Sequence, residues 1–176
     1  PINLEIAPTE EMTKIALSLN PRSVCFVPEK RMEITTEGGL NVKSNMIKID
    51  GLLNLLSNSK IKVACFIEPD LNQIDSVKSL GVRTIEFHTG SYADSKTIKI
   101  MNKNLSLIQN AVQYATELGF DCHAGHGLNF DNVSHIASIK QIKELNIGHF
   151  IIGDAIFSGL KNSIMKMKEI INTARQ

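Results

Sequence analysis

The stretch TIEFHT, residues 84–89, decides which fold this sequence predicts. Apolar and polar residues alternate along it in the order Thr84, Ile85, Glu86, Phe87 and His88. This two-residue period is that of a β-strand with one apolar and one polar face. The segment INLEIA, residues 2–7, repeats the pattern and has Glu5 on its polar face.

Strand-like and helix-like segments alternate along the whole chain. The expected strands are residues 3–7, 23–28, 62–69, 84–89, 120–126 and 149–156. The expected helices are residues 9–19, 45–58, 70–80, 97–118, 132–144 and 158–174. Six consecutive strand–helix units predict parallel strands joined by helices.

An open doubly wound sheet and a TIM (β/α)8 barrel both fit this order of elements. A strand with a polar second face favours the barrel, because the barrel interior near the catalytic mouth accepts polar side chains. A barrel uses about 30 residues for each unit. The 176 residues therefore correspond to about six units, and we expect residues 1–176 to form one incomplete TIM-barrel domain.

The composition limits the possible partners and compartments. The chain has 19 basic and 18 acidic residues, for a net charge of +1, so we expect neither nucleic-acid nor membrane binding. Its three cysteines are widely spaced within apolar segments: Cys25, Cys65 and Cys122. This pattern favours buried, unpaired thiols and a reducing, cytoplasmic location.

In a parallel barrel, functional residues gather at the carboxyl ends of the strands. This rule selects Glu5, Glu86 and the end of the fifth strand, where His126 stands. Two carboxylates at different strand ends can act as a base and an electrostatic stabiliser for proton transfer. The long polar loop after the second strand, residues 29–43, contains Thr35 and is either a substrate-binding loop or a solvated surface loop.

The segment DCHAGHGLNF, residues 121–130, contains two histidines three residues apart. In a regular strand His123 and His126 point to opposite faces, so we expect no metal pair and no metal site. His126 is the better catalytic candidate because it lies nearest the strand end, beside Gly127, where backbone N–H groups are accessible.

Gly148 and His149 precede the segment that we expect to be the last strand. Loops near the last two strands of a barrel often bind phosphate through backbone amides. These two residues are therefore candidates for an anion site, although a histidine in such a place is also a common structural hydrogen-bonding residue.

Several motifs together resemble one family. They are NLEIAPTEEM, VPEKRMEITTEGGL, IEFHTGSYAD, AGHGLNFDNV and ELNIGHFIIGDAIFSGLK. In this order, across nearly the whole chain, they resemble the pyridoxine 5′-phosphate synthases of vitamin B6 biosynthesis. The resemblance implies a (β/α)8 barrel, a homo-octamer, no metal or organic cofactor, and small phosphorylated substrates: 1-deoxy-D-xylulose 5-phosphate and 3-amino-2-oxopropyl phosphate. The implied products are pyridoxine 5′-phosphate, phosphate and water.

The resemblance also implies roles for individual residues. Glu5 matches a general acid/base, His126 a proton donor, and Glu86 a residue that stabilises the transition state. The residues that match substrate or phosphate contacts are Thr35, Gly127, Gly148 and His149.

The chain also departs from the family pattern. The family has two further N-terminal strand–helix units that complete the site, so we expect this chain alone to be inactive. Asp154 stands where a basic residue is common in relatives.

Two alternatives remain open. One is a different phosphosugar enzyme, an aldolase or isomerase, for which Lys30 is the candidate Schiff-base lysine. The other is an inactive fragment that serves as an assembly module.

Overall fold

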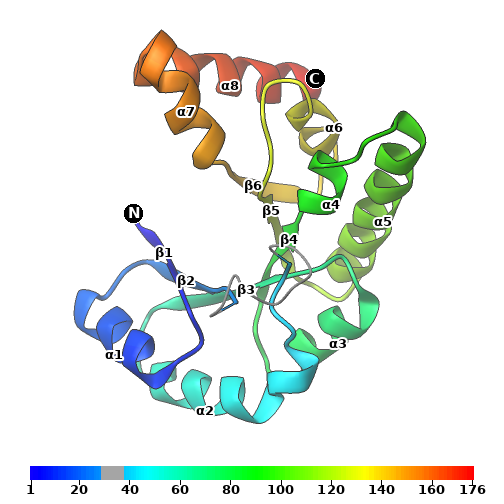
Figure 1. Ribbon diagram of the computed structural model, residues 1–176. Helices are drawn as coiled ribbons and strands as arrows, with labels where there is room; N and C mark the ends of the chain where they lie inside the picture. The colour runs from blue at the N-terminus through cyan, green and yellow to red at the C-terminus, as the bar shows by residue number, and fades with distance from the viewer. Residues whose placement is uncertain (29–37) are drawn as a thin grey trace.

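The computed structural model describes residues 1–28 and 38–176. Six parallel strands form one sheet in sequence order, and the sheet curls so that the helices lie around its outer side (Figure 1). The strands are β1 (Asn3–Ile6), β2 (Ser23–Phe26), β3 (Lys62–Ile67), β4 (Thr84–His88), β5 (Asp121–Gly125) and β6 (Ile142–Asn146). Sequential pairing of parallel strands is the topology of a barrel and differs from the rearranged strand order of a doubly wound sheet.

The helices connect successive strands. They are α1 (Glu10–Leu19), η1 (Lys43–Asn45), α2 (Met46–Leu56), α3 (Leu71–Ser79), α4 (Gly90–Ala93), α5 (Ile98–Glu117), α6 (Val133–Ala137), α7 (His149–Ser158) and α8 (Leu160–Ala174). Side chains fix several helix starts, as in α3, where Asp70 accepts hydrogen bonds from the N–H groups of Asn72 and Gln73. Unpaired N–H groups in the first turn of a helix are satisfied by such caps.

Each strand has two chemically different faces, as the alternation in TIEFHT predicts. Ile85 and Phe87 are fully buried and belong to the large apolar core between the sheet and the helices. The opposite face carries Glu86 and His88 and is continuous with a small apolar layer of Cys25, Ala64 and Phe66. This second face is the concave interior of the sheet, where a barrel places its functional groups.

The sixth unit differs from the sequence-based prediction. Residues 149–156 were expected to form a strand, but they lie in α7, and the last strand is β6. The expected helix over 132–144 is only α6, from Val133 to Ala137. Ile139, Ile142 and Leu145 have helical spacing, which hides the strand, while the apolar run FIIGDAI is compatible with either structure.

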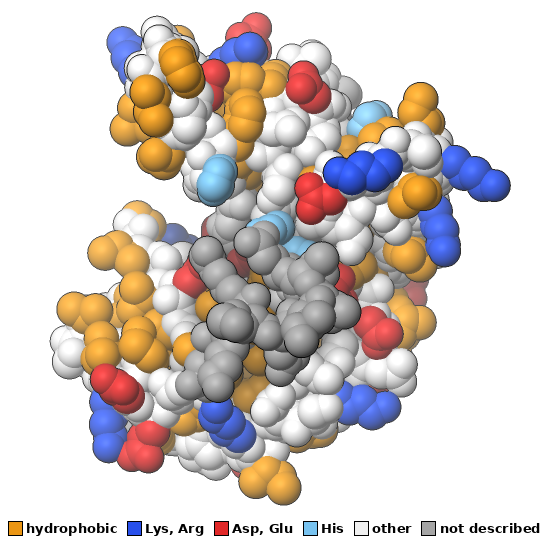
Figure 2. All heavy atoms as spheres, viewed as in Figure 1, with side chains coloured by type: hydrophobic (Ala, Val, Ile, Leu, Met, Phe, Trp, Pro, Cys, Tyr) orange, Lys and Arg blue, Asp and Glu red, His pale blue; other side chains and the backbone are white. Residues whose placement is uncertain are grey.

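β1 and β6 are the two edges of the sheet among the described residues. Figure 2 shows apolar side chains on both sides of the notch that separates the α7–α8 region from the region of β1 and α1. The exposed apolar residues in these elements or directly before them include Ile2, Leu19, Ile152, Ile156, Phe157 and Leu160. Within the described ranges, no helix combines the length and the apolarity that crossing a membrane requires.

Candidate active site

Glu86 is the buried carboxyl group of the concave interior. Its residue is only 4% exposed, and the strand register sets it beside Phe66 of β3 and His123 of β5. The thiol of Cys25, from β2, donates to Glu86 Oε2 at 3.6 Å. Gly125, on β5, leaves room for the carboxyl group, because a Cβ at Gly125 would lie 2.5 Å from Glu86 Oε1.

Burial raises the pKa of Glu86 to about 7. The Asn146 side chain and the Cys25 thiol act in the opposite direction, whereas the carboxylate of Glu5 raises the pKa further. Glu5 therefore acts on Glu86 across the concave interior. A carboxyl group with this pKa can both give and take a proton near neutral pH.

Glu5 lies on β1, in register with Cys25 of β2. Its side chain is on the same concave face as Cys25 and Glu86, but it is exposed because β1 is an edge strand. The structure thus brings Glu5 and Glu86 onto one surface, as the sequence predicts. Thr35 and Lys30, the candidates from the loop after β2, lie outside the described residues.

His126 follows β5 in a turn that departs from strand geometry. Its φ is +82°, a value uncommon for a residue other than glycine. The Thr89 hydroxyl, at the end of β4, lies 2.8 Å from the Gly125 carbonyl oxygen and 2.5 Å from that of His126. The end of β4 therefore stabilises the backbone conformation that presents His126.

This turn corrects the prediction that the two histidines face opposite sides. His123 pairs in register with Glu86 and thus belongs to the concave face. A regular continuation of β5 would point His126 toward the helices with Cys122 and Ala124, but the turn brings its ring to 4.9 Å from the His88 ring. Both histidines therefore lie on the interior side, at different depths.

His88 and Glu68 form a close side-chain pair at this end of the sheet, and neither was among the residues predicted for the site. His88 Nδ1 lies 2.7 Å from Glu68 Oε1, which also accepts the Gly39 N–H at 2.9 Å. Burial alone would raise the pKa of Glu68, but its bonds with His88 and Gly39, together with the nearby charge of His126, hold the pKa below its usual value. The sequence did contain an indication of this position. His88 is two residues from Glu86 on the same strand, so both side chains point to the same face of the sheet.

His123 is deeper in the barrel than the strand-end groups. Its Nδ1 lies 3.6 Å from Glu144 Oε1, and burial lowers its pKa. On the same two strands, Lys143 of β6 forms an ion pair with Asp121 of β5. Across residues 1–28 and 38–176, no group of three or more His, Cys, Asp or Glu side chains is arranged to hold a metal ion. The three cysteines are all buried and unpaired, as predicted.

Gly127, Gly148 and His149 are all exposed. Gly148 caps α7 and His149 is its first residue, so this pair follows the last strand and does not precede it as predicted. Its position at the carboxyl end of β6 agrees with the barrel rule. Asp154, farther along α7, accepts the Ser158 hydroxyl at 2.5 Å, and this bond lowers its pKa.

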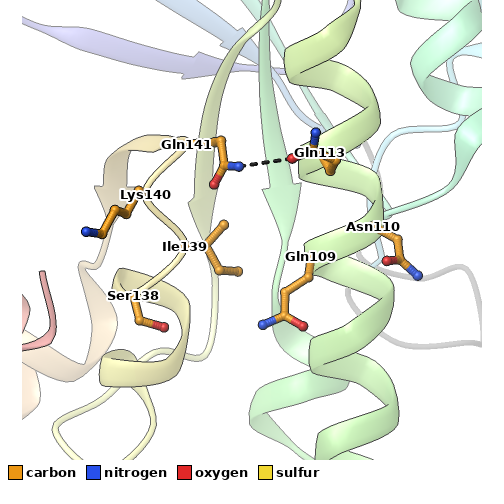
Figure 3. A pocket seen from close by; sticks show the side chains of 7 residues that line it. All are labelled: Gln109, Asn110, Gln113, Ser138, Ile139, Lys140 and Gln141. Atoms are coloured by element: carbon orange, nitrogen blue, oxygen red, sulfur yellow. Dashed lines mark hydrogen bonds between the residues drawn. The ribbon is translucent and has the colours of Figure 1, made fainter.

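A shallow depression on the outside of the molecule is separate from these groups (Figure 3). It lies between α5 and the segment before β6, where Gln141 Nε2 donates to Gln113 Oε1 at 3.0 Å. Its lining residues are Gln109, Asn110, Gln113, Ser138, Ile139, Lys140 and Gln141. None of the predicted site residues lines it.

Comparison with known proteins identifies the family. Residues 1–173 match the family described as "Pyridoxal phosphate biosynthesis protein PdxJ". The chain belongs to the PdxJ family. It is 51% identical over 176 residues to the pyridoxine 5′-phosphate synthase of Sulfurihydrogenibium sp. (strain YO3AOP1), covering 100% of this chain and 72% of that protein. It is 44% identical over 174 residues to the synthase of Rhodospirillum rubrum, covering 99% and 70%. The PdxJ family is thus a family of pyridoxine 5′-phosphate synthases.

Solved structures of much lower sequence identity share the fold. An HpcH/HpaI aldolase from Desulfitobacterium hafniense DCB-2 matches with a TM-score of 0.57 at 10% identity, covering 98% of this chain and 73% of that one. The putative copper homeostasis protein CutC from Streptococcus agalactiae matches with a TM-score of 0.54 at 15% identity, covering 82% and 71%. These similarities support a fold of the TIM-barrel type for this PdxJ chain and carry no information about its chemistry.

Proposed function

We propose that the complete gene product containing this chain condenses 1-deoxy-D-xylulose 5-phosphate with 3-amino-2-oxopropyl phosphate to give pyridoxine 5′-phosphate, phosphate and water. The observation that supports this most directly is the buried Glu86, whose pKa of about 7 suits repeated proton transfer. It lies on β4, next to β5, the strand that His126 directly follows. Condensation, dehydration and ring closure all require such transfers at carbon and oxygen.

The proposed roles follow from position and chemistry. Glu5 acts as general acid/base from β1, and His126 donates a proton from the turn after β5. Glu86, between them on the concave face, stabilises the charge that develops in the transition state. Its proximity to Glu5, which raises its pKa, supports their joint action on one substrate.

Four residues are proposed to contact the phosphorylated substrates. Gly148 and His149 begin α7, a ten-residue helix directly after β6, where free backbone N–H groups and the helix dipole favour anions. Gly127 follows His126 and is exposed on the same end of the sheet. Thr35 is proposed as a contact to deoxyxylulose phosphate on the resemblance of its motif alone.

We further propose that the complete protein is a single-domain, eight-stranded barrel in the cytoplasm that assembles as an octamer. The chain spans 72% of its Sulfurihydrogenibium relative, which leaves room for about two units of some 30 residues. Two such units would join the edges β1 and β6 and enclose Glu5. Residues 1–176 alone are proposed to be inactive because the interior beside β1 stays open.

The test is product formation from the two substrates by the complete gene product, followed by chromatography of pyridoxine 5′-phosphate. His126→Asn should abolish most of the activity, because general acid catalysis contributes about 10²–10⁴-fold. His135→Asn is the matched control, since His135 is exposed and contacts Tyr92 on α4. The assignment fails if the unsubstituted protein binds both substrates and forms no product.

The alternative phosphosugar reactions have no specific support. The aldolase that shares the fold is only 10% identical, and Lys30 lies outside the described residues. Trapping of a substrate on Lys30 by borohydride would favour the aldolase.

A further inference from the structure

His88 is a buried histidine at the end of β4 that the proposed chemistry does not use. It is 4% exposed and is enclosed by groups from the two neighbouring strands, β3 and β5, and from the turns that follow them. Glu68 binds its Nδ1 at 2.7 Å, the Phe66 ring meets it edge-on at 5.2 Å between centroids, and the His126 ring lies at 4.9 Å with a tilt of 55°. His88 therefore has a single orientation fixed on several sides.

The second ring nitrogen of His88 is also distinctive. Nε2 is buried and has no hydrogen-bond partner among the described residues. The absence of a side chain at Gly90 makes room for both rings. A Cβ at Gly90 would lie 2.5 Å from His88 Nε2 and 3.1 Å from His126 Cδ2. Unpaired buried polar atoms are uncommon in folded proteins and require a reason. Here the two imidazole rings meet over a glycine that no other residue can replace without moving them.

We propose that His88, oriented by Glu68, is a positioning residue for His126. The chain of contacts runs from the Gly39 N–H to the Glu68 carboxylate, then to His88 and finally to the His126 ring. The carboxylate fixes the rotation of the His88 ring, as carboxylates do for histidines in many active sites. The His88 ring in turn limits the orientations open to His126.

This support matters because the backbone of His126 alone does not fix its ring. The Thr89 hydroxyl holds the backbone turn through carbonyl oxygens, whereas the rotation of the His126 ring about χ1 and χ2 is set by the groups that surround the ring. A proton donor that is misplaced by about 1 Å loses roughly 100-fold in rate. His88 and Phe66 provide the neighbouring surfaces, at 4.9 and 6.5 Å between ring centroids.

The test measures kcat and KM of the complete gene product for both phosphorylated substrates, and it rests on the proposed function. His88→Asn keeps a donor for Glu68 but removes the ring, and Glu68→Ala removes the acceptor. Each should lower kcat by about 10–100-fold and change KM by less than about threefold, because the proposal assigns these residues to the orientation of His126 and not to substrate binding. Glu68→Gln keeps an acceptor and should restore most of kcat.

The double variant of His88 and Glu68 should lose little more than the worse single variant, since residues that act as a unit are not additive. His135→Asn is the control for loss of a histidine elsewhere. Unchanged kcat in His88→Asn, or a loss confined to KM, overturns the proposal. If His88→Asn does not fold, equal kcat for Glu68→Ala and Glu68→Gln overturns it. An inactive unsubstituted protein would instead refute the proposed function.

Discussion

Replacing Glu86 by glutamine tests whether the burial of this carboxyl group governs the pH dependence of folding. Burial, together with the charge of Glu5, raises its pKa from 4.5 to about 7. The folded chain therefore keeps this proton up to about pH 7, whereas the unfolded chain releases it near pH 4.5. Between these values the folded state holds more protons, so the free energy of unfolding falls as pH rises.

The size of the effect follows from the pKa difference. One pH unit corresponds to about 1.4 kcal/mol, so Glu86 costs about 3 kcal/mol of stability above pH 7 relative to pH 4.5. Glu86→Gln removes the titrating group but keeps the shape of the side chain. The stability of the variant relative to the unsubstituted chain should therefore rise by about 3 kcal/mol across this window.

The assay is urea unfolding of both chains at several pH values from 4.5 to 8, with free energies taken by linear extrapolation. Other titrating groups are common to both chains and largely cancel in the difference. Glu117→Gln, on the exposed surface of α5, is the control and should show no such trend. A Glu86→Gln difference that stays constant within about 1 kcal/mol, or that falls with rising pH, would refute the reasoning.

Three further substitutions probe the support of the site and the fold. Thr89→Val removes the hydroxyl that donates to the carbonyl oxygens of Gly125 and His126, and it should lower the free energy of unfolding by about 1–3 kcal/mol in urea. An unchanged free energy of unfolding would show that these hydrogen bonds are replaceable. Gly125→Ala sets a methyl group 2.5 Å from a Glu86 oxygen and should cost about 1–3 kcal/mol by the same measurement, whereas a neutral result would mean that the carboxyl group moves freely. Asp70→Ala should lower stability by about 0.5–2 kcal/mol through loss of the α3 cap, while activity of the complete gene product stays unchanged.

Sequence pattern predicted the first five strands, and it predicted the two faces of β1 and β4 because apolar and polar residues alternate along them. Ile85 and Phe87 had to face the helices, so Glu86 had to face the interior. The same reasoning failed for β6, whose segment IKELN is an edge strand with little burial and a bulge in its pairing with β5. Three of its five residues, Lys143, Glu144 and Leu145, are good helix formers, and pairing with β5 makes the segment a strand.

The candidate site was partly predictable for a similar reason. Strand parity and the barrel rule selected Glu5 and Glu86 from a local pattern. The position of His126 depended on a left-handed turn that its own sequence does not require, and the turn is held by Thr89 from a neighbouring strand. Glu68 meets His88 only through the pairing of β3 with β4. Contacts between distant segments determine these features, and a local reading has no access to them.

The apolar side chains of α7 connect the incorrect strand prediction with the proposed completion of the barrel. α7 has no buried residues, and Ile156 and Phe157 are 78% and 92% exposed. A helix that is apolar on most sides normally lies inside a protein, so sequence pattern assigned this segment to the core as a strand. Burial of α7 in the complete protein is consistent with its position near the two unpaired edges of the sheet, β1 and β6 (Figure 1). Burying a side chain such as Phe157 stabilises a fold by about 1.5–3 kcal/mol, and two additional strand–helix units between β6 and β1 would supply that burial.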